Sequence, residues 1–107
     1  MSQLIPLYDL NQLNDFVDLP LPTIVKAKAG HDYTEIDSNL REFIAEYPQI
    51  RLATFDIYEQ RDIAMELSIT DAPAFLLYES GEIKHKITGD IPGQVQEFIE
   101  KAEEALH

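Results

Sequence analysis

The stretch from Ile69 to Ile83 limits the folds open to this chain more than any other stretch. It places Pro73 before five apolar or aromatic residues, which are followed by a tight turn at Ser80-Gly81 and an alternating segment. Proline has no backbone N–H, so a sheet accepts it only at the first residue of a strand, at a bulge or at an edge. Pro73 suits the first of these positions. The stretch therefore predicts a buried strand that opens at Pro73 and returns through a hairpin.

Segments of strand and helix character alternate along the rest of the chain. Asp9 or Asn11 is the expected N-cap of the first helix, and Asp32 with Glu35 has the form of a capping box for the second. The order, β-α-β-α-β-α-β-β-α, predicts one α/β domain over residues 1–107 with a central mixed sheet and helices on both faces. The expected strands are 4–8, 23–29, 50–57, 73–79 and 83–88, and the expected helices are 10–17, 34–47, 60–67 and 92–106.

Period-two alternation assigns side chains to the faces of two strands. Lys26 and Lys28 share one face of the strand 23–29. We expect them to lay their stems on the surface and to pair with carboxylates, with anion binding beside a helix N-terminus as the alternative. In the half-exposed strand near the C-terminus, Ile83 and Ile87 are expected on the same, covered face.

Charge and residue types exclude several function classes. Eight basic residues face twenty acidic ones, for a net charge of −12, and binding to nucleic acid or to a membrane surface needs clustered Lys and Arg. Cysteine is absent, which removes disulfides, thiolate metal sites and thiol chemistry. The three histidines are scattered and no calcium-loop pattern occurs, so no metal or cofactor is expected. We expect a cytoplasmic protein, since no signal-type or membrane-spanning apolar run is visible.

The chain resembles the thioredoxin-like superfamily over nearly its whole length. The most specific feature is the entry into the strand at Pro73, preceded by a short helical segment and followed by a hairpin and an acidic helix. In the family, the equivalent proline follows a cis peptide bond, so the resemblance implies a cis Ala72-Pro73 bond. The matching segments are 40–47, 53–57, 67–73, 80–82, Gly89 and 98–99.

The resemblance fails at the residues that perform the family's redox chemistry. Aligning the chain backwards from Leu40 places Gly30-His31-Asp32-Tyr33 on the family's Cys-x-x-Cys motif. The same alignment places Ala29 on the motif's tryptophan and Ile24 on the buried acid that assists proton transfer. The resemblance therefore implies a redox-inactive member without disulfide oxidoreductase activity.

Two segments form a candidate edge for binding a partner. His31, Asp32 and Tyr33 offer a polar and aromatic rim, although Asp32 as a helix N-cap, a solvated His31 and Tyr33 as a lid on the sheet explain the same residues. The backbone before Pro73 can pair with an extended peptide by strand addition, or the proline simply shapes a turn. The candidate edge comprises Gly30, His31, Asp32, Tyr33, Thr70, Asp71, Ala72 and Pro73.

The sequence thus predicts a non-catalytic module that binds a protein or peptide. One alternative is a structural domain that self-associates, for example as a homodimer. The other is a non-thiol enzyme that uses His31 or Lys26.

Overall fold

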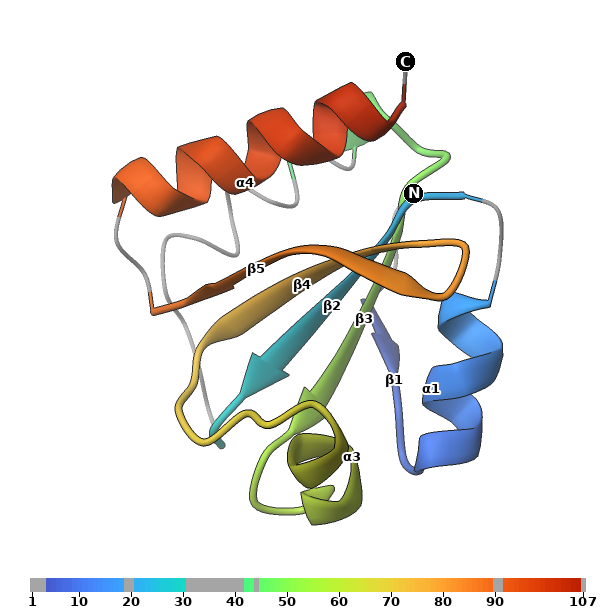
Figure 1. The fold of residues 1–107 in the computed structure, drawn as a ribbon, viewed down its shortest axis with the longest axis vertical. Helices are drawn as coiled ribbons and strands as arrows, with labels where there is room; N and C mark the ends of the chain where they lie inside the picture. Colours follow the sequence, from blue (N-terminus) through green and yellow to red (C-terminus); the bar gives the residue numbers. More distant parts are fainter. Residues whose placement is uncertain (1–3, 19–20, 31–41, 44, 90–91, 107) are drawn as a thin grey trace.

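A computed structural model of the chain describes residues 4–18, 21–30, 42–43, 45–89 and 92–106 (Figure 1). The predicted helix 34–47 lies mostly outside these residues, as does its capping box, and helical residues are described at 42–43 and 45–46. None of the helices in the described ranges is long and apolar enough to cross a membrane. The described elements are β1 (Leu4–Pro6), α1 (Leu10–Val17), β2 (Thr23–Lys28), β3 (Arg51–Asp56), α3 (Arg61–Glu66), β4 (Ala74–Glu79), β5 (Glu82–Thr88) and α4 (Pro92–Ala105).

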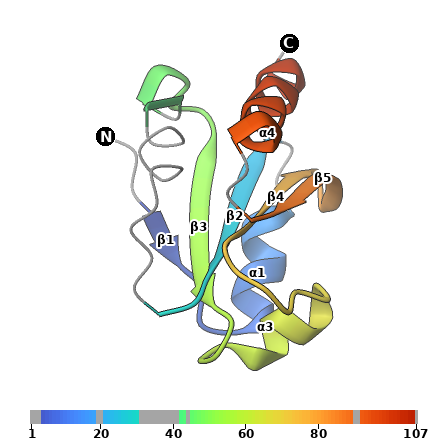
Figure 2. The same cartoon turned by 90° about the vertical axis from the view of Figure 1, so that its left-hand side faces the viewer.

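The five strands form one mixed sheet in the order β1-β3-β2-β4-β5, as Figure 2 shows. β1, β3 and β2 run parallel, while β4 and β5 are antiparallel to their neighbours. β2 is buried along most of its length, as expected for a central strand covered on both faces. The predicted α/β class with a mixed central sheet is confirmed.

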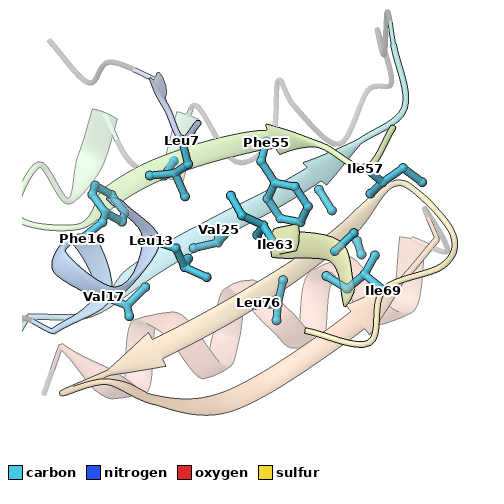
Figure 3. Close-up of a cluster of buried hydrophobic side chains, with 14 of the residues drawn as sticks. Leu7, Leu13, Phe16, Val17, Val25, Phe55, Ile57, Ile63, Ile69 and Leu76 are labelled. Atoms are coloured by element: carbon cyan, nitrogen blue, oxygen red, sulfur yellow. The ribbon is translucent and has the colours of Figure 1, made fainter. Parts of the chain in front are cut away.

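Helices cover both faces of the sheet and create two apolar cores. On one face, α1 and α3 pack on the sheet through Leu13, Phe16 and Ile63 (Figure 3). On the other face, α4 packs through Val95, Phe98 and Ala102 against strand residues such as Phe75. The Phe75 and Phe98 ring centroids are 6.0 Å apart in a tilted arrangement, a favourable geometry for aromatic pairs.

The entry into β4 and its hairpin have the predicted geometry. The Ala72-Pro73 peptide bond is cis, and β4 begins at the residue that follows the proline. Ser80 and Gly81 have φ of 53° and 83°, the positive values that a two-residue hairpin turn matched to the strand twist requires. The Gly81 N–H donates to the Val17 carbonyl at 3.0 Å, which ties the hairpin to the end of α1.

The two outer strands of the sheet, β1 and β5, are both irregular. β1 contains only three residues, and the last is Pro6. β5 has a register shift opposite Leu77 and Tyr78, so that Ile83 pairs with Tyr78, whose side chain belongs to the core under α1 and α3. Ile83 is 46% exposed whereas Ile87 is buried. The prediction that they share one covered face is wrong, because the bulge changes the alternation between them.

The first helix begins where the sequence predicted. Asp9 is the N-cap of α1, and its carboxylate accepts the Gln12 backbone N–H at 2.8 Å. The Gln12 side-chain oxygen in turn accepts the Tyr8 N–H at 2.6 Å. Reciprocal bonds of this kind satisfy N–H groups that have no partner inside the helix.

Candidate functional site

The carboxyl ends of β2 and β3 meet the start of β4 at one end of the sheet, next to α3 (Figure 1). Ala27 pairs with Ala74 across the antiparallel β2–β4 ladder, so Pro73 lies beside the end of β2. The Pro73 carbonyl accepts the Gly89 N–H at 2.7 Å, which ties the loop to β5. Gly30, which follows β2, and the loop 70–73, which precedes β4, therefore lie at the same end of the sheet.

Asp56, at the end of β3, organises this end of the sheet. Its side chain is buried, and its two oxygens accept backbone N–H groups from Gly30 and Tyr58, each at 2.8 Å, and from Glu59 at 3.3 Å. Burial by itself raises the pKa of Asp56, but these three hydrogen bonds and nearby Lys28 favour the carboxylate and lower the pKa overall. The charged side chain thereby fixes both the exit from β2 and the loop that follows β3.

Sequence reasoning did not identify Asp56 as part of the site. A usable signal was present, since an aspartate that ends a strand before a polar loop can accept the backbone N–H two residues later. The Asp56 N–H also donates to the Gln60 side chain at 3.0 Å, and Gln60 precedes α3. One residue thus connects β2, β3 and the start of α3.

Lys26 is buried, and the prediction that it lies on the surface is wrong. Its side chain is 2% exposed, and its ammonium nitrogen lies 6.0 Å from the centre of the Phe75 ring. Its register partner on β3 is Thr54, whose buried hydroxyl has no hydrogen-bond partner in the described structure. The sequence predicted that one face of the strand 23–29 is open to solvent. In the structure β2 is covered on both faces, so Lys26 is buried as well.

The residue that the resemblance aligns with the family's buried acid is apolar and buried. Ile24 has 0% exposure and belongs to the core under α4. Lys26 is the only ionisable residue on β2 with so little exposure, as Lys28 is half-buried. The residue that the resemblance aligns with the family's acid therefore carries no carboxylate, and the ionisable side chain that β2 buries is a lysine.

An apolar hollow of about 550 Å³ opens beside the loop that leads to Pro73. The exposed side chains of Tyr58 and Met65 border it, at 67% and 79% exposure. Figure 3 shows Ile57 and Ile69, which form part of its lining, at one end of the core cluster. The hollow was not predicted, since it joins residues from the loop after β3, one side of α3 and the segment before β4. The described residues that line it are Ile57, Tyr58, Arg61, Ala64, Met65, Ser68, Ile69 and Thr70.

The loop before Pro73 presents unpaired backbone groups at the rim of this hollow. Thr70 and Asp71 are exposed, and Ala72 and Pro73 are half-buried. In the described part of the structure, no hydrogen bond engages the backbone of Thr70, Asp71 or Ala72. These groups are free to pair with an extended segment of another chain.

The remaining candidate residues divide into one that is described and three that are not. Gly30 is exposed, has a φ of 64° and donates its N–H to Asp56. The predictions for His31, Asp32 and Tyr33 lie outside the described residues. Among the described residues, no group of three or more acidic or histidine side chains is arranged to hold a metal ion.

Comparison with known proteins gives one family. The family model described as thioredoxin matches residues 22–101. The mitochondrial thioredoxin-3 of Saccharomyces cerevisiae is 34% identical over 61 residues, which are 57% of this chain and 48% of that protein. The matched part thus spans about half the length of this curated relative.

Solved thioredoxins have the same fold. The thioredoxin of Trypanosoma brucei brucei superposes with a TM-score of 0.82 at 16% identity, covering 96% of this chain and 93% of the other. A thioredoxin mutant of Entamoeba histolytica gives a TM-score of 0.81 at 17% identity, covering 94% and 100% of the two chains.

Proposed function

The chain belongs to the thioredoxin family yet contains no cysteine, and from this premise we propose that it acts by binding a protein or peptide. Disulfide exchange requires a thiolate, which no residue of this chain can supply. Binding is supported by the end of the sheet at which the loop 70–73 lies. The cis Ala72-Pro73 bond and the exposed loop before it are present without the sulfur chemistry that accompanies them in the family.

The observation that carries the proposal is the hollow next to the loop 70–72. Large exposed apolar patches on a protein surface commonly mark sites of interaction. Here Tyr58 and Met65 are exposed at the border of a concave, largely apolar surface. The free backbone groups of the loop lie along it, so one extended peptide can make main-chain hydrogen bonds to the loop and insert a side chain into the hollow.

Replacing the exposed apolar groups tests the proposal. We expect the double variant Tyr58→Ser/Met65→Ser to lose the specific partners that the wild-type protein retains from a lysate of its own cells, as measured by quantitative mass spectrometry. Tyr8→Ser/Ile83→Ser is the matched control, because Tyr8 and Ile83 are exposed apolar residues, at 64% and 46%, that do not line the hollow. Thermal melts of both variants should stay close to that of the wild type.

Two results of this experiment would contradict the proposal. Equal partner lists for wild type and the Tyr58/Met65 variant would remove the hollow as a binding surface. A mass in solution that rises with concentration, and that the same variant reduces to one chain, would instead show that the hollow joins two copies. Sedimentation of the wild type and variant distinguishes the second result from loss of a foreign partner.

The redox part of the proposal has a separate test. We expect the chain to leave the rate of insulin reduction by dithiothreitol unchanged, because it has no thiol that can enter a mixed disulfide. Stimulation of that rate by the purified protein would show that it performs redox chemistry by a route other than cysteine.

A further inference from the structure

Among the described residues that line the hollow, one side chain is charged, that of Arg61. The other lining residues are apolar, aromatic or hydroxyl-bearing. Arg61 is exposed and is the first residue of α3, so the helix fixes the position of its backbone. A single cation beside an apolar surface gives a ligand a preferred sign of charge as well as an apolar contact.

Arg61 differs from the other cations in the described residues because it has no partner. Within the part of the chain that the structure describes, no ion pair, hydrogen bond or ring contact engages its guanidinium, although the chain carries twenty acidic residues. Lys28 acts on the buried Asp56 carboxylate. The other described cations are engaged as follows: Arg51 stacks 4.3 Å from the centre of the Phe16 ring, Lys84 and Lys101 pair with Glu82 and Glu104, Lys86 donates to the Leu67 carbonyl, and Lys26 lies 6.0 Å from the centre of the Phe75 ring.

The acidic residues next to Arg61 in the sequence form no ion pair with it in the described structure. The Asp62 carboxylate accepts the backbone N–H of Ile63 at 2.9 Å. Glu59 is exposed on the preceding loop and forms no ion pair with Arg61. The guanidinium therefore keeps its five N–H donors available, and their planar fork matches a carboxylate in a bidentate arrangement.

An extended peptide provides the right spacing for both contacts. Alternate side chains of a strand point to the same face, about 7 Å apart. Thr70 belongs both to the loop with free backbone groups and to the lining of the hollow. A side chain next to the loop can therefore enter the hollow, while the side chain two positions along the peptide, on the same face, reaches its rim.

From these observations we propose that the hollow selects acidic peptides, in which an Asp or Glu stands two residues from an apolar side chain. Arg61 binds the carboxylate and determines this specificity. The inference rests on the proposed binding function and names the chemical class of the ligand. The sign of the preference is local, since the net charge of −12 by itself favours basic ligands at long range.

The test uses a library of short randomised peptides, acetylated and amidated at their ends so that side chains are the only carboxylates. Peptides selected by the wild type should be enriched in Asp or Glu two positions from an apolar residue. We expect Arg61→Gln to weaken the selected peptides by about five- to tenfold in fluorescence anisotropy, as for loss of a charge-assisted pair at a partly exposed site. Arg61→Lys should be intermediate, and Arg61→Glu should shift the selection toward Lys and Arg.

Lys101→Gln is the matched control for these variants. It removes one positive charge from an exposed position on α4, which Figure 1 shows at the opposite end of the molecule from α3. Its affinity for the selected peptides should equal that of the wild type. An equal loss in Arg61→Gln and Lys101→Gln would mean that net charge and not the position of Arg61 sets the preference, and would overturn the inference.

Failure of the inference and failure of the proposed function give different results. Selection of neutral or basic peptides that lose binding in Tyr58→Ser/Met65→Ser would overturn the acidic preference and leave a peptide-binding hollow. Selection of no peptide, or only of peptides that bind this double variant as well as the wild type, would overturn both. Unchanged melting temperatures for the Arg61 variants confirm that the affinities compare folded proteins.

Discussion

Asp56 is the residue whose replacement should affect the site and the stability of the fold together. Its oxygens accept two backbone hydrogen bonds of 2.8 Å and one of 3.3 Å. Hydrogen bonds to a charged group contribute up to about 1.5 to 3 kcal/mol each, but Gly30, Tyr58 and Glu59 are exposed and water can replace part of the loss. We therefore expect Asp56→Ala to lower the free energy of unfolding by about 2 to 3 kcal/mol at pH 7.

Asp56→Asn should have a smaller effect for a geometric reason. Asn keeps one oxygen to accept the N–H groups of Tyr58 and Glu59, but it turns an amide NH₂ toward the Gly30 N–H that Asp56 accepted. We expect a loss of about 1 to 2 kcal/mol. Urea unfolding followed by circular dichroism measures both values, and the order of midpoints should be wild type, then Asn, then Ala.

The difference between wild type and Asp56→Asn should depend on pH. Because the folded-state pKa of Asp56 lies below its ordinary value, the carboxylate stabilises the fold at pH values above its unfolded-state pKa of about 3.9. That contribution is lost as the pH falls through the folded-state pKa, so the two unfolding curves should approach each other in strong acid. A loss under about 0.5 kcal/mol in Asp56→Ala, or a wild-type advantage over Asn that is the same at pH 7 and pH 3, would refute this account of Asp56.

Two further predictions concern the core and the hairpin. Phe98→Ala should lower the free energy of unfolding by about 3 to 5 kcal/mol, because the ring has 0% exposure and contacts Phe75. A loss below about 1 kcal/mol in chemical denaturation would contradict this packing. Gly81→Ala should destabilise the fold by about 1 kcal/mol because Gly81 has a φ of 83°. Gly93→Ala, in the exposed first turn of α4 with open space around it, should instead stabilise the fold slightly through the helix propensity of alanine. Equal shifts of the two melting temperatures would argue against the assigned turn.

The sequence predicted those parts of the fold where local chemistry and packing agree. Pro73 could open a strand in few ways, and Ser80-Gly81 matched the turn that a hairpin needs. Asp9 had a capping side chain just before an apolar helical pattern. In each case the residue type itself restricts the backbone, so no knowledge of distant contacts was required.

The errors arose where a distant element decides the environment of a residue. Lys26 was expected at the surface because lysine usually lies there, but helices on both faces of the sheet bury β2. Ile83 was expected on a covered face, but a bulge in β5 turns its side chain to the other face. No residue of β5 indicates this bulge in the sequence. The hollow beside Tyr58 and Met65 joins three segments that are separate in the sequence, so no single motif encodes it.

The construction of the outer strands bears on how this protein behaves when it is concentrated. Sheets aggregate by adding strands from other molecules at an open edge, and proline, lysine and bulges hinder that addition. β1 ends with Pro6, while β5 carries Lys84 and Lys86 and a bulge. The addition of further strands is therefore hindered at both edges of the sheet. We expect a concentrated solution of this chain to resist aggregation for this structural reason as well as through its low isoelectric point.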